Sequence, residues 1–113
     1  ERDSVKIIRE SLKRDFGTWL HKQTGGPFAE IGASDLYGTL PGGRAIYIEV
    51  KKPQTKGLQT NRAVIQRAWL DRERALGAVA IVASSYEDVL TAINAAKIYP
   101  HRQIKKSDIE SIS

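Results

Sequence analysis

Apolar residues recur every three or four positions at the start of the chain, with cationic residues between them. Within residues 3–16 the apolar positions are Val5, Ile8, Leu12 and Phe16. This spacing predicts an amphipathic helix, which Gly17 is placed to end. A second helix is expected at about residues 59–76, followed by Gly77. Its apolar side is irregular and consists of Val64, Ile65, Ala68, Trp69 and Leu76.

Between the two helices the chain has the pattern of strands. Residues 34–40 and residues 44–51 are joined by Pro41-Gly42-Gly43, a short glycine-containing loop that predicts a β-hairpin. A further short strand is expected at residues 18–23, before the turn at Gly25-Gly26-Pro27. Three consecutive strands therefore separate the two helices.

After the second helix, the continuous apolar run at residues 78–83 has the length of a strand buried on both faces. Ser84, with Glu87 three positions later, predicts a capping box at the start of a third helix. This order of elements predicts an α/β fold with a small mixed sheet flanked by helices. We expect residues 1–98 to form one domain. Residues 99–113 form a basic tail that docks as a short helix, reaches a partner, or frays.

The ionisable residues narrow the chemistry of the protein. Its 113 residues include no cysteine and only two histidines, which excludes a disulfide framework and a Cys-based zinc site. A bound metal must be held mainly by oxygen, which favours Mg²⁺, Mn²⁺ or Ca²⁺. The 18 Lys and Arg residues exceed the 13 Asp and Glu residues, and the net charge of +5 suits a polyanion such as DNA.

The sequence shows no pattern of membrane insertion or secretion. No apolar run approaches the roughly 20 residues that cross a bilayer, and no signal-peptide pattern opens the chain. We expect an intracellular soluble protein that does not bind membranes. Because the sequence contains no methionine, we also expect its start to be trimmed or processed.

The candidate chemistry lies on the strand at residues 46–51. Side chains on a strand alternate between its two faces. One face carries Ile46, Ile48 and Val50, and the other carries Tyr47, Glu49 and Lys51. A hairpin that turns at residues 41–43 puts Asp35 roughly opposite Glu49. The two carboxylates are therefore expected to converge, with Lys51 close to them.

Two convergent carboxylates and a lysine suit metal-assisted cleavage of a phosphodiester. The carboxylates would hold a hard divalent cation, which lowers the pKa of a bound water and neutralises charge on the phosphate. The Val50 carbonyl could complete the coordination. Lys51 would orient or deprotonate the attacking water, or stabilise charge on the phosphate. The alternative is that Glu49 and Lys51 form a solvated surface pair in a structural or interaction domain.

Four short elements follow one another along the chain. They are Gly32-x-Ser34-Asp35, Ile48-Glu49-Val50-Lys51-Lys52-Pro53, Gln66-x-x-Trp69-Leu70 and Gly77. In order and spacing they resemble the VRR-NUC branch of the PD-(D/E)xK nuclease superfamily, from about Lys22 to Val89. The resemblance implies a restriction-endonuclease-like core with the order α-β-β-β-α-β-α.

The resemblance also implies a set of site residues. The metal ligands for Mg²⁺ or Mn²⁺ would be Asp35, Glu49 and the Val50 carbonyl. Lys51 would be the catalytic lysine, and Gln66 would line the same site from its helix.

Two further groups of residues complete the expected site. The family has an additional Glu early in its first helix, for which the candidates in this chain are Glu1 and Glu10. Lys22, Lys52 and Lys56 would flank the site and are the expected contacts to DNA phosphates.

Short free-standing members of the family look like phage-encoded enzymes that dimerise and cut branched DNA such as four-way (Holliday) junctions. The expected function is therefore that of a homodimeric, metal-dependent, structure-selective DNA endonuclease, acting in the cytoplasm of a bacterial host if it is phage-encoded. The alternative is a non-catalytic DNA-binding module with the same fold. The presence of the whole residue set argues against that module.

Overall fold

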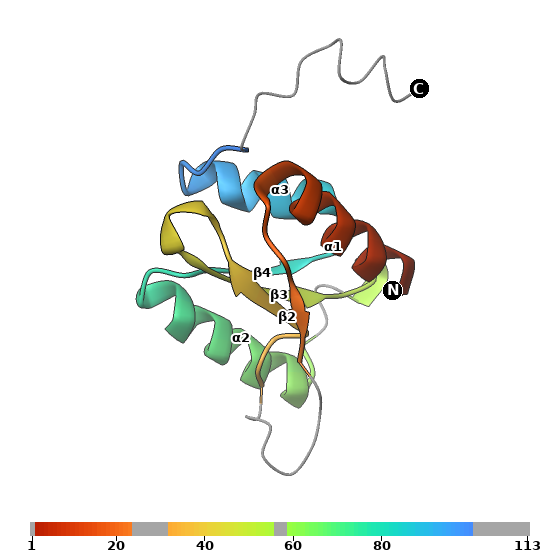
Figure 1. The fold of residues 1–113 in the computed structure, drawn as a ribbon. Coiled ribbons are helices and arrows are strands. Elements are labelled where there is room, and N and C mark those ends of the chain that lie inside the picture. Colours follow the sequence, from red (N-terminus) through yellow and green to blue (C-terminus); the bar gives the residue numbers. More distant parts are fainter. Residues whose placement is uncertain (1, 24–31, 56–58, 101–113) are drawn as a thin grey trace.

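The computed structural model describes residues 2–23, 32–55 and 59–100 and confirms the predicted order of elements (Figure 1). The helices and strands are α1 (Arg2–Phe16), β1 (His21–Lys22), β2 (Leu36–Thr39), β3 (Ala45–Val50), α2 (Asn61–Ala75), β4 (Val79–Ala83) and α3 (Tyr86–Ala95). Short 3₁₀ turns lie at Pro41–Gly43 and Pro53–Thr55. Among the described helices, none is long and apolar enough to cross a membrane. Most of the predicted tail, residues 101–113, lies outside the described residues.

The four strands form one mixed sheet in the order β1-β2-β3-β4. β1 pairs with β2 and β2 with β3 in antiparallel fashion, whereas β3 and β4 are parallel. A parallel pair needs a crossover between its strands, and α2 supplies it. In the hairpin Leu36 pairs with Ile48, so one further step places Asp35 opposite Glu49, as the sequence predicts.

The sheet lies between two helical layers (Figure 1), with α1 and α3 on one face and α2 on the other. The larger core cluster joins α1 and α3 to the sheet, and it contains Ile46, Ile48 and Val50 of β3, each fully buried. The smaller cluster lies under α2 and includes Trp69 with Tyr47 packed against it. The predicted alternation of side chains along β3 is therefore confirmed.

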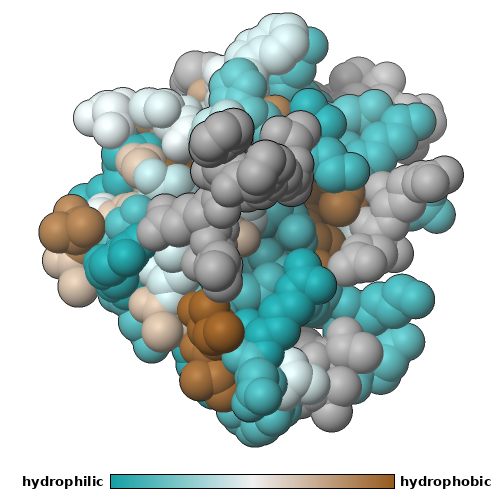
Figure 2. All heavy atoms as spheres, turned by 90° about the horizontal axis from the view of Figure 1, so that it is seen from below, coloured by the Kyte–Doolittle hydropathy of each residue, from teal (hydrophilic) through white to brown (hydrophobic). Residues whose placement is uncertain are grey.

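The face that α2 turns to the sheet differs from the predicted one. Its buried residues are Gln66, Trp69 and Leu70. Four of the five predicted apolar positions are exposed, namely Val64, Ile65, Ala68 and Leu76. The reason is that a polar residue, Gln66, occupies a position that faces the sheet, so hydrophobicity alone misplaces the buried side. Figure 2 looks from the α2 side and shows mainly hydrophilic atoms with separate apolar areas.

The cap of α3 also lies one residue later than predicted. The Ser85 hydroxyl, rather than that of Ser84, accepts a hydrogen bond from the Asp88 N–H at 3.2 Å. The Asp88 carboxylate in turn accepts from the Ser84 N–H at 2.8 Å. Asp88 therefore takes the part that the sequence analysis gave to Glu87, whose side chain is exposed. Because two adjacent serines are each followed by an acid three positions later, the sequence pattern does not distinguish between the two possible caps.

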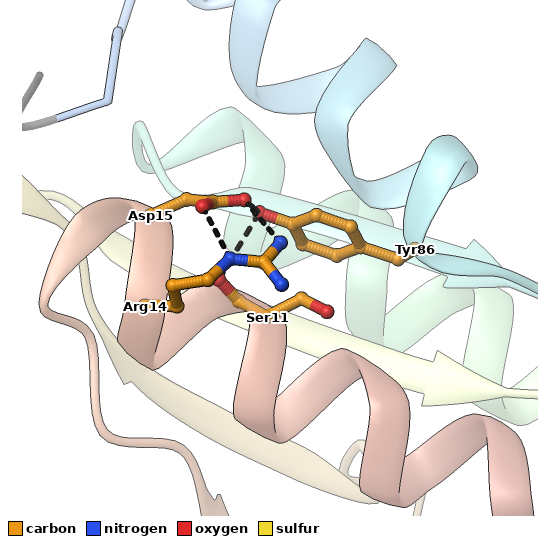
Figure 3. A network of polar contacts seen from close by, with 4 residues as sticks. All are labelled: Ser11, Arg14, Asp15 and Tyr86. Atoms are coloured by element: carbon orange, nitrogen blue, oxygen red, sulfur yellow. Dashed lines mark hydrogen bonds and ion pairs between the residues drawn. The ribbon is translucent and has the colours of Figure 1, made fainter. Parts of the chain in front are cut away.

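A polar network joins the end of α1 to the start of α3 (Figure 3). The Tyr86 hydroxyl donates to Asp15 Oδ2 at 2.8 Å, and Arg14 Nε donates to Asp15 Oδ1 at 2.8 Å. Burial, followed by the bond to Asp15, raises the pKa of Tyr86, so this hydroxyl stays a donor at any physiological pH. The network holds α1 against α3, and α1 is the helix that borders the candidate site.

Candidate active site

The two predicted carboxylates meet through reciprocal bonds between neighbouring strands. The Asp35 N–H donates to Glu49 Oε1 at 3.2 Å, and the Val50 N–H donates to Asp35 Oδ2 at 3.0 Å. Each acid therefore binds the backbone of the segment that carries the other. Hairpin register alone brings them together, because Asp35 lies one residue before β2 and Glu49 one residue before the end of β3.

Glu49 is the central residue of the arrangement and is only 2% exposed. Its Oε2 atom accepts a hydrogen bond from Gln66 Nε2 at 2.7 Å and lies 3.3 Å from Lys51 Nζ. Gln66 projects from α2, and the Lys51 N–H is bonded to the Ala83 carbonyl of β4 at 2.9 Å. Gln66 from α2 and Lys51, which follows β3, therefore converge on the Glu49 carboxylate, as expected from the sequence.

The loop before Asp35 is held in place by two short-range features. The buried Ser34 hydroxyl donates to the Leu36 carbonyl at 2.9 Å, which fixes the bend at Asp35. Gly32 adopts φ +87°, and a Cβ added there would lie 2.8 Å from Ile65 Cγ2 on α2. Only glycine allows this backbone to approach α2 so closely in that conformation. The Gly-x-Ser-Asp motif thus positions the acid as well as supplying it.

The electrostatics of Glu49 are those of a carboxylate that benefits from a cation. Burial, and then the charge of Asp35, raise the pKa of Glu49, while Lys51 and Gln66 lower it and only partly offset that effect. A neighbouring negative charge disfavours the ionised form of Glu49. A positive ion between Asp35 and Glu49 would remove this repulsion.

The carboxylates open into a pocket of about 540 Å³. Its described lining residues are Val5, Lys22, Asp35, Leu36, Glu49, Lys51 and Arg62. Arg62 is a lining residue that sequence reasoning missed. A signal for it was present, because Arg62 precedes Gln66 by four positions and residues so spaced share one side of a helix.

The remaining predicted site residues are distributed differently. Lys22 lines the pocket, and its contact with a DNA phosphate stays a prediction. Lys52 is exposed directly after Lys51. Glu10 lines a neighbouring groove rather than the pocket that holds the two carboxylates. Glu1 and Lys56 lie outside the described residues.

The oxygen atoms of the site fit a hard divalent cation. Among the described residues, none donates a hydrogen bond to Asp35 Oδ1. The N–H and C=O of one strand residue point to the same side, so the Val50 carbonyl faces the Asp35 side together with its N–H. No described cluster of three or more His, Cys, Asp or Glu side chains could hold a metal by itself. Two carboxylates and a carbonyl could therefore supply part of an oxygen-only ligand set, with water or phosphate as the remaining ligands.

Comparison with known proteins agrees with this arrangement. No protein-family model matches the sequence, and no curated protein matches it. A solved structure described as a VRR_NUC domain is similar, with a TM-score of 0.62 and 26% sequence identity. The similarity covers 83% of this chain and 94% of that one. The mixed sheet flanked by helices, with acids at a strand end, thus defines a nuclease-like α/β domain. This similarity confirms the resemblance to the VRR-NUC family that was inferred from the motifs.

Proposed function

We propose that this nuclease-family domain is a divalent-metal-dependent DNA endonuclease with Asp35, Glu49, Lys51 and Gln66 as its site residues. The observation that carries the proposal is the environment of Glu49. A buried carboxylate with a raised pKa lies beside a second carboxylate and a lysine, at the wall of an open pocket. Perturbed titratable groups that converge in a pocket are typical of catalytic sites.

Asp35, Glu49 and the Val50 carbonyl would hold Mg²⁺ or Mn²⁺. When bound, such an ion supplies a water of lowered pKa and neutralises charge on the phosphate. The chain's own residues prepare this site. The Val50 N–H orients the Asp35 carboxylate, and the Asp35 N–H orients the Glu49 carboxylate.

Lys51 and Gln66 have different parts in the proposed reaction. Lys51 is 27% exposed at the wall of the pocket, where its ammonium can contact a phosphate oxygen and stabilise the charge that develops during cleavage. Gln66 is buried and donates to Glu49, so it is a positioning residue that keeps the carboxylate in one orientation.

The proposed substrate is branched DNA, and the proposed assembly is a homodimer. The described part of the chain offers one pair of site carboxylates and therefore one scissile phosphate per chain. Symmetric cleavage of a four-way junction requires two such sites related by a twofold axis, which a dimer supplies.

The proposal is tested by incubating labelled four-way junction, flap and linear duplex DNA with Mg²⁺, with Mn²⁺ and with a chelator. We expect cleavage that needs the metal and is lost in Glu49→Gln and Lys51→Ala, while both variants still bind DNA. Arg44→Ala is the matched control, because Arg44 precedes β3 and lies at the opposite end of that strand from Glu49. Binding without metal-dependent cleavage on any substrate would contradict the enzyme and favour a non-catalytic module.

A further inference from the structure

A second groove continues from the candidate active site along α1. Its described lining residues are Val5, Lys6, Arg9, Glu10 and Lys22, and its volume is about 360 Å³. Val5 and Lys22 also line the pocket that contains Asp35 and Glu49. The two hollows therefore adjoin at Val5 and Lys22, and together they extend from the carboxylates toward the exposed side of α1.

The side chains along this path are mostly cationic, and several are available to a ligand. Among the described residues, no ion pair or side-chain hydrogen bond engages Lys6, Lys22 or Arg62. Arg9 is partly committed, since its guanidinium donates to the Leu20 carbonyl at 3.2 Å. Glu10 is the single acid among the described residues of the groove. The balance of charge remains positive along its length.

Arg62 lies on the other side of the carboxylates. α1 and α2 cover opposite faces of the sheet (Figure 1), and Arg62 lies in the first turn of α2. Lys22 lines both the pocket and the α1 groove, and Lys6 lines the groove alone, whereas Arg62 lines the pocket from α2. Free cations therefore flank the proposed scissile position in two directions.

We propose that the α1 groove and Arg62 bind the sugar–phosphate backbone of the DNA strand that is cut, on either side of the scissile phosphate. Lys22 and Lys6 contact phosphates on one side, and Arg62 contacts a phosphate on the other. The inference rests on the proposed nuclease function for its choice of ligand. A backbone ligand is favoured because the groove offers separated cations, which suit successive phosphates. Among its described lining residues there is no aromatic side chain on which a base could stack.

The test is the salt dependence of DNA binding, measured by fluorescence anisotropy in EDTA. The variants are Lys6→Ala, Arg62→Ala and their combination, with Arg44→Ala as a control that removes the same charge away from the path. For duplex DNA, each lost phosphate contact lowers the slope of log K against log salt by about 0.9, which corresponds to roughly eightfold weaker binding at 0.1 M salt. We expect such a loss for each single variant, both losses in the combination, and none in the control.

The side of each contact can be tested with DNA that carries one neutral methylphosphonate linkage. We expect linkages on one side of the mapped cut to weaken binding of the parent protein but not of Lys6→Ala. Linkages on the other side should lose their effect only in Arg62→Ala. If both variants lose sensitivity to the same linkage, the proposed path along the two faces is wrong.

Failure of this inference is distinguishable from failure of the proposed function. If the parent protein cleaves DNA but Lys6→Ala and Arg62→Ala bind like Arg44→Ala, the groove proposal is wrong and the nuclease stands. If both variants bind DNA more weakly and with a smaller salt dependence, but the parent protein never cleaves, the groove proposal is supported and the catalytic proposal is wrong. Circular dichroism melts of all variants check that these exposed substitutions leave the fold intact.

Discussion

The Gln66 side chain donates a 2.7 Å hydrogen bond from α2 to Glu49 Oε2 on the central strand β3. Both residues are buried, and the bond spans the layer between helix and sheet. Gln66→Leu would leave the carboxylate without this donor. Loss of a hydrogen bond to a buried charged group costs about 1–3 kcal/mol, and the pKa of Glu49 should rise further. Urea unfolding and the pH dependence of cleavage measure the two effects. Cleavage with an unchanged pH profile would contradict the positioning role.

The raised pKa of Glu49 predicts how the metal-free protein responds to pH. The folded state holds a proton on Glu49 more tightly than the unfolded chain does, because burial and Asp35 disfavour the charged form. The free energy of unfolding therefore falls as pH rises from the ordinary glutamate pKa through the raised one, and the loss is complete above it.

Glu49→Gln tests this linkage because the variant cannot ionise at that position. In EDTA at neutral pH we expect it to unfold at a higher urea concentration than the parent protein. Below the ordinary glutamate pKa the difference should vanish. A parent protein that is the more stable of the two at neutral pH would show that the ionised form is favoured by folding.

Metal binding should reverse that penalty. A ligand that binds only the folded state at a hundred times its Kd raises the free energy of unfolding by about 2.7 kcal/mol. We expect Mg²⁺ or Mn²⁺ to raise the Tm of the parent protein and of Arg44→Ala. The rise should be lost in Asp35→Asn, which keeps the shape of the side chain and removes its charge. An equal rise in all three proteins would place the cation elsewhere.

Gly32 offers a test of how the loop before Asp35 is placed. Gly32→Ala forces a Cβ to within 2.8 Å of Ile65 Cγ2 at a backbone φ of +87°. Gly42→Ala is the matched control, with φ +86° and nothing within 4 Å of the added carbon. The left-handed conformation costs about 1–2 kcal/mol in both variants. Only Gly32→Ala should also weaken metal binding, measured by calorimetry. Similar metal affinities in the two variants would contradict the close approach.

Tyr86→Phe tests the network between α1 and α3. The change removes the hydroxyl that donates to the buried Asp15 carboxylate, at an expected cost of about 1–3 kcal/mol. Urea unfolding measures that cost, and DNA cleavage at low temperature should stay near the parent value because the network touches no site residue. A full loss of cleavage in a folded variant would assign α1 a more direct part in the reaction.

Residues that depend on hairpin geometry could be predicted from the sequence. The turn at residues 41–43 and the alternation of β3 were sufficient to place Asp35 opposite Glu49, as the register of Leu36 with Ile48 confirms. The short loop between the two strands sets their register, so the local sequence is enough to predict which residues lie opposite each other.

Residues that depend on how α2 sits on the sheet could not be predicted in the same way. Gln66 was identified through the family motif, since a polar residue in a buried position breaks the hydrophobic pattern. Arg62 was missed for the same reason, although its four-residue spacing from Gln66 was present. Val64 and Ile65 are apolar but exposed, so the apolar side predicted for α2 included positions that face solvent. A helix that serves a site has a polar position facing inward, and periodicity alone interprets that position as surface.

The reciprocal bonds of Asp35 and Glu49 make strand pairing and active-site assembly one event. A slip of the hairpin by a single residue would turn the paired side chains to opposite faces and break both bonds at once. A chain with misaligned strands therefore has no paired carboxylates to hold a cation. The protein cannot acquire a competent site before its central hairpin has reached the native alignment.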